Sequence, residues 1–303
     1  IAVLGTNGIV TSWGDNRYGQ STVPAALQIA RPLTDTLRVV SLAAGADHTL
    51  ALRANGSVLA WGNNDAGQVT IPTGLSNVVQ IAAGVQHSVA LLADGTVRSW
   101  GANSVGQTTQ PALGGIAKIA AGGWHTIALR RDNTVIAWGL NDMGQTTLGN
   151  YTNVIDIAAS AKNSMLLLAN GQIIVVGQNE YGQRSVPTGY YQRIGAGAYH
   201  LLAISDNEQA VGWGLSADNQ TAIPGDLYHP FQITGGMNFS AALVQQLTAP
   251  VDTNQTIAPT APALPYMPTA LPKPNHTQFI EITANGTFGP TDFNGSEIAV
   301  TTG

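Results

Sequence analysis

Short apolar runs, small residues and turn-forming pairs alternate along most of the chain. One unit begins with Ile81-Ala82-Ala83-Gly84 and continues with residues 88–92, where small and large side chains alternate. Such alternation is the period of a β-strand, and small residues mark places where backbones approach closely. The pair Asp94-Gly95 follows and the chain returns through residues 96–100. Because such pairs readily adopt a positive φ, the pattern predicts a two-residue hairpin between two short strands.

The same hairpin slot recurs along the chain. Its other copies are Asn7-Gly8, Asn55-Gly56, Asp132-Asn133, Asn170-Gly171 and Asp206-Asn207. No segment carries a long apolar period of 3.6 residues, which a helix requires. The pattern therefore predicts an all-β fold.

Two sequence elements repeat in register with these hairpins. The first is W-G-x-N-x-x-G-Q, which begins at Trp13, Trp61, Trp100 and Trp138, with degraded copies from Val176 and Trp213. The second is G-x-x-H-[ST], whose histidines are His48, His87, His125 and His200. Three or four short strands in a repeat of about 40 residues are typical of a propeller blade.

The number of repeats favours seven blades over the alternative of six. The hairpin strand occurs seven times, from Ile1-Ala2-Val3-Leu4 to Ser240-Ala241-Ala242-Leu243, whereas the Trp-Gly strand occurs six times. In a seven-bladed ring the first blade lacks its first strand and the last blade lacks its last. Open sheet edges of this kind need partners for their backbone groups.

The paired motifs resemble the regulator-of-chromosome-condensation repeat family. The flanking Ser-Thr-Val-Pro, Val-Thr-Ile-Pro and Ser-Val-Pro segments are similar to those of bacterial secreted members such as β-lactamase inhibitor protein II. The resemblance covers residues 1–246 and implies a β-propeller. It does not by itself imply one function, because such propellers serve as exchange factors, inhibitors and scaffolds.

Three segments follow from these boundaries: a propeller over 1–246, a Pro/Thr-rich linker over 247–276 and a strand-bearing tail over 277–303. The tail strands predicted to support assembly contain Phe279, Ile280, Ile282, Ile298 and Val300. They can pair with the open propeller blade or with another subunit. Possible glycosylation sites in the linker and tail are Asn254, Asn275, Asn285 and Asn294. An insertion of about ten residues at 28–37 breaks the repeat and predicts a loop or short helical turn on one rim.

Composition narrows the classes of function. Charged residues make up 10% of the 303 residues, against about 25% in ordinary soluble domains, and the net charge is −5. Without a basic block a nucleic-acid partner is not expected, and without cysteine there are no disulfides or thiolate metal sites. No apolar run is long enough to span a membrane. High Gly, Thr, Asn and Gln content favours an extracellular or cell-surface location.

The recurring histidines are predicted to be structural. They repeat once per blade and so spread around a ring, whereas a metal site needs three or four ligands at one point. The slot also holds Asn163 and Phe239. The recurring tryptophans, Trp13 included, are predicted to pack between blades. We therefore expect no metal, no cofactor and no catalytic residues, although a site at the propeller axis stays open as an alternative.

The variable residue before the histidine slot is the candidate for partner binding. It is Asp47, Gln86, Trp124, Lys162 and Tyr199 in successive repeats. The resemblance to the inhibitor implies that aromatic residues on this rim contact a partner, and here Trp124 and Tyr199 have that character. The sequence favours a non-enzymatic surface, adhesion or filament-assembly module. Its expected partners are other protein subunits, including further copies of itself or a filament or surface component, and glycans. The alternative is a soluble protein-binding or inhibitor propeller.

Overall fold

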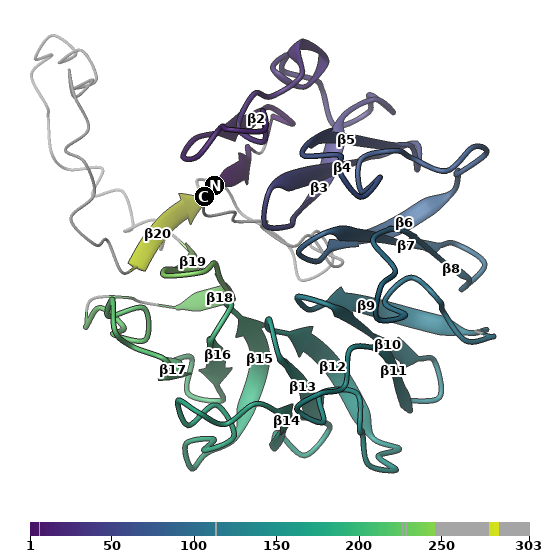
Figure 1. Ribbon diagram of the computed structural model, residues 1–303. Coiled ribbons are helices and arrows are strands. Elements are labelled where there is room, and N and C mark those ends of the chain that lie inside the picture. Colours follow the sequence, from purple (N-terminus) through teal and green to yellow (C-terminus); the bar gives the residue numbers. More distant parts are fainter. Residues whose placement is uncertain (6, 113, 226, 228, 246–278, 285–303) are drawn as a thin grey trace, which may run out of the picture.

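The computed structural model describes residues 1–245, except positions 6, 113, 226 and 228, together with the strand at 279–284. Seven sheets stand around a common axis (Figure 1), an arrangement consistent with the predicted seven blades. Numbered in chain order, sheet 1 is β1 (Ala2–Leu4) and β2 (Val10–Ser12), and sheet 2 is β3 (Val39–Ala44), β4 (His48–Arg53) and β5 (Val58–Gly62). Sheet 3 is β6 (Val78–Ala83), β7 (His87–Leu92) and β8 (Val97–Gly101), and sheet 4 is β9 (Ile116–Ala121), β10 (His125–Arg130) and β11 (Val135–Gly139).

The later sheets continue the series. Sheet 5 is β12 (Val154–Ala159), β13 (Asn163–Leu168) and β14 (Ile173–Gly177), and sheet 6 is β15 (Tyr191–Ala196), β16 (His200–Ser205) and β17 (Ala210–Gly214). Sheet 7 is β18 (Pro230–Gly235), β19 (Ser240–Gln245) and β20 (Phe279–Ala284). The one helix in the described residues is a 3₁₀ turn, η1 (Ala25–Leu27). The all-β prediction is confirmed.

The hairpins form where the turn chemistry predicts them, with one shift. In sheet 2, Leu52 pairs with Val58, and Gly56 at the tip has a φ of 75°. In sheet 6, the residue with positive φ is Glu208, at 59°, rather than Asn207. The pairing of Ile204 with Ala210 places Glu208 at the tip, so the Asp206-Asn207 assignment was one residue early.

The hydrophobic core lies between neighbouring sheets rather than within one. A representative cluster joins Val89 and Leu91 of sheet 3 to Ile116, Ile119 and Trp138 of sheet 4. Full burial of such a side chain contributes about 1.5–3 kcal/mol, so each sheet depends on its neighbours. Phe239 and Ala241 of sheet 7 pack against Ile1, which closes the ring between the last sheet and the first.

Sheet 7 differs from the others in its third strand. There β18 and β19 pair antiparallel, whereas β20 pairs with β19 in parallel register, Ser240 opposite Phe279. Three tail residues predicted for an assembly strand, Phe279, Ile280 and Ile282, therefore lie in a strand that pairs within this chain. The other two, Ile298 and Val300, lie outside the described residues. The four sequon asparagines also lie outside them: Asn254, Asn275, Asn285 and Asn294.

Candidate protein-binding face

The strands end on two opposite rims of the ring. The loop rim carries the turns between first and second strands and the Asn-rich loops that follow the third strands. The hairpin rim carries the two-residue hairpins. A six-residue strand such as β4 separates the rims by about 20 Å.

Each Asn-rich loop is shaped by the constant residues of W-G-x-N-x-x-G-Q. After β5, Asn64 Oδ1 accepts the N–H of Val69 at 3.0 Å, and Gln68 Oε1 accepts the N–H of Ala66 at 2.9 Å. Gln68 itself is buried. The motif thus satisfies part of its own backbone, buries Asn63 and leaves Asp65 exposed.

The carbonyl of this glutamine joins neighbouring sheets. Trp100 Nε1 and Ser88 Oγ, both in sheet 3, donate to Gln68 O at 2.9 and 2.8 Å. His48 of sheet 2 lies 3.0 Å from Ser88 Oγ through Nε2. Because the single hydroxyl hydrogen of Ser88 goes to Gln68, Nε2 of His48 carries the proton and donates.

This arrangement recurs around the ring. Tryptophan-to-glutamine bonds also join Trp61 to Gln20, Trp138 to Gln107 and Trp213 to Gln183. Histidine-to-hydroxyl bonds also join His87 to Thr126, His125 to Ser164 and His200 to Ser240. Trp13 is the exception to the packing prediction: it is 41% exposed, whereas the other four are 7–8% exposed.

The histidines are buried and do not converge. Burial lowers the pKa of His48 to about 3 and those of His87, His125 and His200 to about 4, so all four are neutral near pH 7. Each contacts a hydroxyl of the next sheet through Nε2. In the part of the chain that the structure describes, no three metal-ligating side chains gather.

A belt of backbone hydrogen bonds runs along the loop rim. The N–H of Val85 donates to Gly123 O, Gly123 to Ala161 O, Ala161 to Ala198 O and Ala198 to Gly236 O, at 2.9–3.2 Å. These bonds link the turns of sheets 3 to 7 in sequence. The loop rim is therefore a fixed base for the side chains that it carries.

The structure places the five predicted partner-binding residues at equivalent positions on this rim. The carbonyl of each accepts the N–H that follows its own Trp-Gly or Val-Gly strand: Asp47 from Asn63, Gln86 from Ala102, Trp124 from Leu140, Lys162 from Gln178 and Tyr199 from Leu215. The backbone of each residue is thereby fixed. Lys162 also forms an ion pair with Asp142 at 3.4 Å.

Sequence reasoning missed a second set of residues on the same rim. Val105, Met143 and Tyr181, at the variable position before Gly-Gln, are 37%, 46% and 41% exposed. With the half-buried Trp124 and Tyr199 they follow sheets 3 to 6, and we name these five residues the aromatic arc. Tyr181 and Tyr199 make an edge-to-face contact with ring centroids 6.2 Å apart. The large apolar or aromatic residue at this position in four repeats, Tyr18 included, was the signal that could have found it.

The ring axis carries polar side chains that join sheets. On the first strands, Lys118 Nζ bonds Asp156 Oδ1 at 2.5 Å. The Gln80 amide bonds both the N–H and the carbonyl of Ile119, at 2.9 and 3.0 Å. These contacts bridge adjacent sheets and stabilise the ring.

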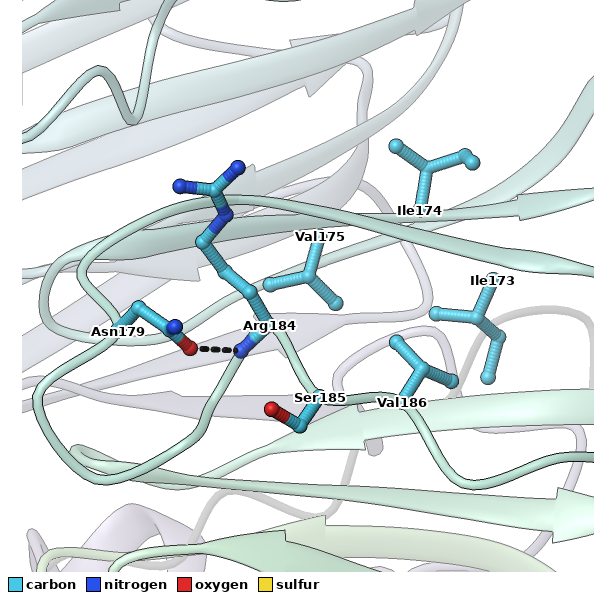
Figure 2. A pocket seen from close by; sticks show the side chains of 7 residues that line it. All are labelled: Ile173, Ile174, Val175, Asn179, Arg184, Ser185 and Val186. Carbon is cyan, nitrogen blue, oxygen red and sulfur yellow. Dashed lines mark hydrogen bonds between the residues drawn. The ribbon is translucent and has the colours of Figure 1, made fainter.

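An open groove of about 630 Å³ lies on the outer edge of sheet 5. Figure 2 shows Ile173 and Val175 of β14 facing Val186, and Asn179 Oδ1 accepting the N–H of Arg184 at 2.8 Å. Arg184 is the one charged residue that lines it. The groove thus brings no pair of titratable groups together.

Comparison with known proteins supports the repeat assignment. The Regulator of chromosome condensation (RCC1) repeat matches residues 39–68, 78–107 and 116–145. No curated protein matches the chain by sequence.

Within the described residues no helix has the length and apolar character needed to cross a membrane.

Solved structures share the fold. Prp20p from Saccharomyces cerevisiae is 21% identical, with 78% of each chain covered and a TM-score of 0.67. The ectodomain of receptor kinase CR4 from Physcomitrella patens is 24% identical, with 67% of this chain and 60% of that chain covered and a TM-score of 0.57. Human WBSCR16 is 18% identical, with 80% and 84% covered and a TM-score of 0.58. The matched repeats, the seven sheets and these neighbours make the chain a β-propeller built from RCC1-type repeats.

Proposed function

We propose that this propeller is a protein-binding module whose partner docks on the loop rim over the aromatic arc. The observation that carries the proposal is the exposure of Val105, Met143 and Tyr181 on consecutive sheets of a hydrogen-bonded rim. Adjacent exposed apolar side chains mark interaction sites more often than scattered ones do.

The composition of the arc suits a binding hot spot. Tryptophan and tyrosine dominate such sites because they bury large areas at low cost in conformational entropy. Trp124 and Tyr199 are anchored through their carbonyls, so little ordering remains to be done on binding. Prp20p, which shares the fold, binds Gsp1p and histones, and this supports a protein partner for the present chain without identifying it.

A photo-crosslinking experiment tests the proposal. A photoreactive phenylalanine at Met143 is expected to capture a partner from the cells or medium of the source, and one at Tyr190, on the hairpin rim, is the matched control. With the captured protein purified, Trp124→Ala and Tyr181→Ala are each expected to raise the dissociation constant at least tenfold. Equal capture from both positions, or unchanged affinity in both alanine variants, would contradict docking on the arc.

We propose, as a second candidate, that the tail makes the propeller a surface, adhesion or assembly module outside the cell. The parallel pairing of β20 with β19 favours it, because a strand from beyond a long intervening segment fills the edge of sheet 7. An edge strand of this kind can be exchanged between subunits. Low charge and high Gly, Thr, Asn and Gln content agree with an extracellular location.

Deletion of residues 247–303 tests the role of the tail. If the tail strand is exchanged between subunits, the truncated chain loses its oligomeric mass in sedimentation velocity. Unchanged mass and unchanged unfolding midpoint would rule out this role.

A further inference from the structure

The insertion at 28–37 is held rigidly against two hairpins. The N–H of Arg31 donates to Asn7 O in sheet 1 at 2.9 Å, and the N–H of Asn55 in sheet 2 donates to Thr36 O at 2.8 Å. Within the insertion, Asp35 accepts the N–H of Leu37 and a guanidinium N–H of Arg31, both at 2.7 Å. The insertion is therefore a fixed part of the hairpin rim.

Three apolar side chains of the insertion face solvent despite this fixed backbone. Ile29 is 56%, Leu33 79% and Leu37 39% exposed. These side chains thus stay exposed on a segment whose backbone is held by hydrogen bonds to sheets 1 and 2. Covering them with another surface would be favourable, because it removes apolar area from water.

The charges around these residues are positive, against the trend of an acidic chain. Arg31, Arg38 and Arg53 surround the insertion, and Asp35 is the one carboxylate among residues 1–12, 28–39 and 53–58. Arg38 lies over the hairpin of sheet 1, since a Cβ on Gly8 would be 2.7 Å from Arg38 Cγ. This patch has a formal charge of +2 in a chain of net charge −5.

The loop rim of the same two sheets has the opposite character. Trp13 and Tyr18 are 41% and 47% exposed there. Three carboxylates, those of Asp15, Asp47 and Asp65, accompany one cation, Arg17, among residues 13–20, 45–47 and 61–68. This apolar patch therefore has a formal charge of −2.

We infer that copies of this chain stack along the propeller axis, with the insertion of one copy seated on the loop rim of sheets 1 and 2 of the next. The two patches lie at opposite ends of the same strands, so a shift along the axis brings one onto the other. Apolar area meets apolar area, and positive charge meets negative charge. Because the two patches differ, the contact is heterologous. A pair of copies therefore still has one unused patch at each end. The stack consequently grows as an open filament. This inference does not depend on the aromatic arc.

Sedimentation velocity of the full chain over a range of concentrations tests the stacking. The weight-average mass is expected to rise with concentration without levelling at a dimer, and to fall when salt is raised. Leu33→Asp and Tyr18→Asp each remove one patch, so each variant alone is expected to be monomeric. Tyr190→Asp, which alters a 59% exposed residue on the hairpin rim away from the insertion, is the matched control and is expected to assemble as the unaltered chain does.

Mixing the two variants gives the decisive measurement. A Leu33→Asp copy keeps its loop rim and a Tyr18→Asp copy keeps its insertion, so a mixture is expected to form one-to-one dimers that cannot grow. A monomeric full chain at all concentrations, a mixture without dimers, or assembly unaffected by both variants would overturn the proposal. Assembly that is lost on deletion of residues 247–303 but persists in both variants would assign it to the tail instead.

Discussion

The two rims of this propeller are built from the same strands but hold together differently. On the loop rim, a buried histidine, a hydroxyl and a tryptophan together bond sheet 2 to sheet 3, and His87, Thr126 and Trp138 repeat this between sheets 3 and 4. On the hairpin rim, each turn mainly satisfies itself: Asp94 Oδ1 accepts both the N–H and the Oγ1–H of Thr96. One backbone bond, from Ile116 N–H to Gly95 O at 3.1 Å, joins that turn to the next sheet. The side-chain bonds between sheets are thus concentrated at the loop rim. Substitutions there are expected to lower the free energy of unfolding more than substitutions on the hairpin rim.

The largest expected effect is acid unfolding through the loop rim. The folded-state pKa of each buried histidine, about 3 or 4, lies below the ordinary value of 6.5. The unfolded chain therefore binds protons first as the pH falls. Stability is fully present above pH 6.5 and falls toward pH 4, by about 1.4 kcal/mol per pH unit for each histidine.

Urea unfolding at pH 7.5, 6 and 5 measures this loss. Hydrogen bonds to Thr96 and Thr134 lower the pKa values of the hairpin-rim carboxylates Asp94 and Asp132. These carboxylates therefore affect stability only at lower pH than the histidines do. A free energy of unfolding that stays constant from pH 7.5 to pH 5 would contradict the role given to the histidines.

A glycine-to-alanine substitution on each rim compares how much the two rims contribute to stability. A Cβ on Gly84, at the loop rim, would lie 2.2 Å from His87 Cε1 and 2.6 Å from the backbone oxygen of Gly122. We expect Gly84→Ala to lower the free energy of unfolding by about 3 kcal/mol or more, because backbone of the next sheet must move. At Gly114, near the hairpin rim, a Cβ meets nothing within 4 Å, and Gly114→Ala is expected to leave the unfolding midpoint unchanged. Equal losses in the two variants would show that the rims do not differ.

The residues that join the sheets at the loop rim were predictable from the sequence, whereas the direction of β20, the exposure of Trp13 and the arc positions were not. The repeated Trp-Gly and His-Ser motifs fixed the loop rim because their spacing matches one sheet per repeat. The direction of β20 was not predictable, since an alternating segment such as Phe279–Ala284 fits an edge in either direction. Exposure of Trp13 escaped prediction because the motif is the same as in the buried copies, and only the neighbouring sheet decides how much covers it. The arc positions Val105, Met143 and Tyr181 were hidden because they vary between repeats.

The smallest expected effects come from single hydrogen-bonding groups. Ser88→Ala removes the buried bond to Gln68 O and leaves His48 Nε2 without its acceptor, at a cost of about 1–3 kcal/mol. Asp94→Ala removes two bonds at an exposed turn, where water replaces them, and is expected to shift the thermal midpoint less than Ser88→Ala does. Thermal unfolding of both variants at pH 7.5 gives the comparison, and a larger shift for Asp94→Ala would reverse the ranking of the rims.

On the loop rim, the groups that link the turns of neighbouring sheets are main-chain atoms, whereas the groups that face a partner are side chains. Because the bonds from Val85 to Gly236 use main-chain atoms, the side chains at Gln86, Trp124, Lys162 and Tyr199 carry little of the ring's cohesion. Mutations at these positions can change the recognised partner while the fold is retained, much as antibody loops vary on a constant framework. The same rim is therefore a natural site for a randomised library, with new binding specificities selected on an unaltered scaffold.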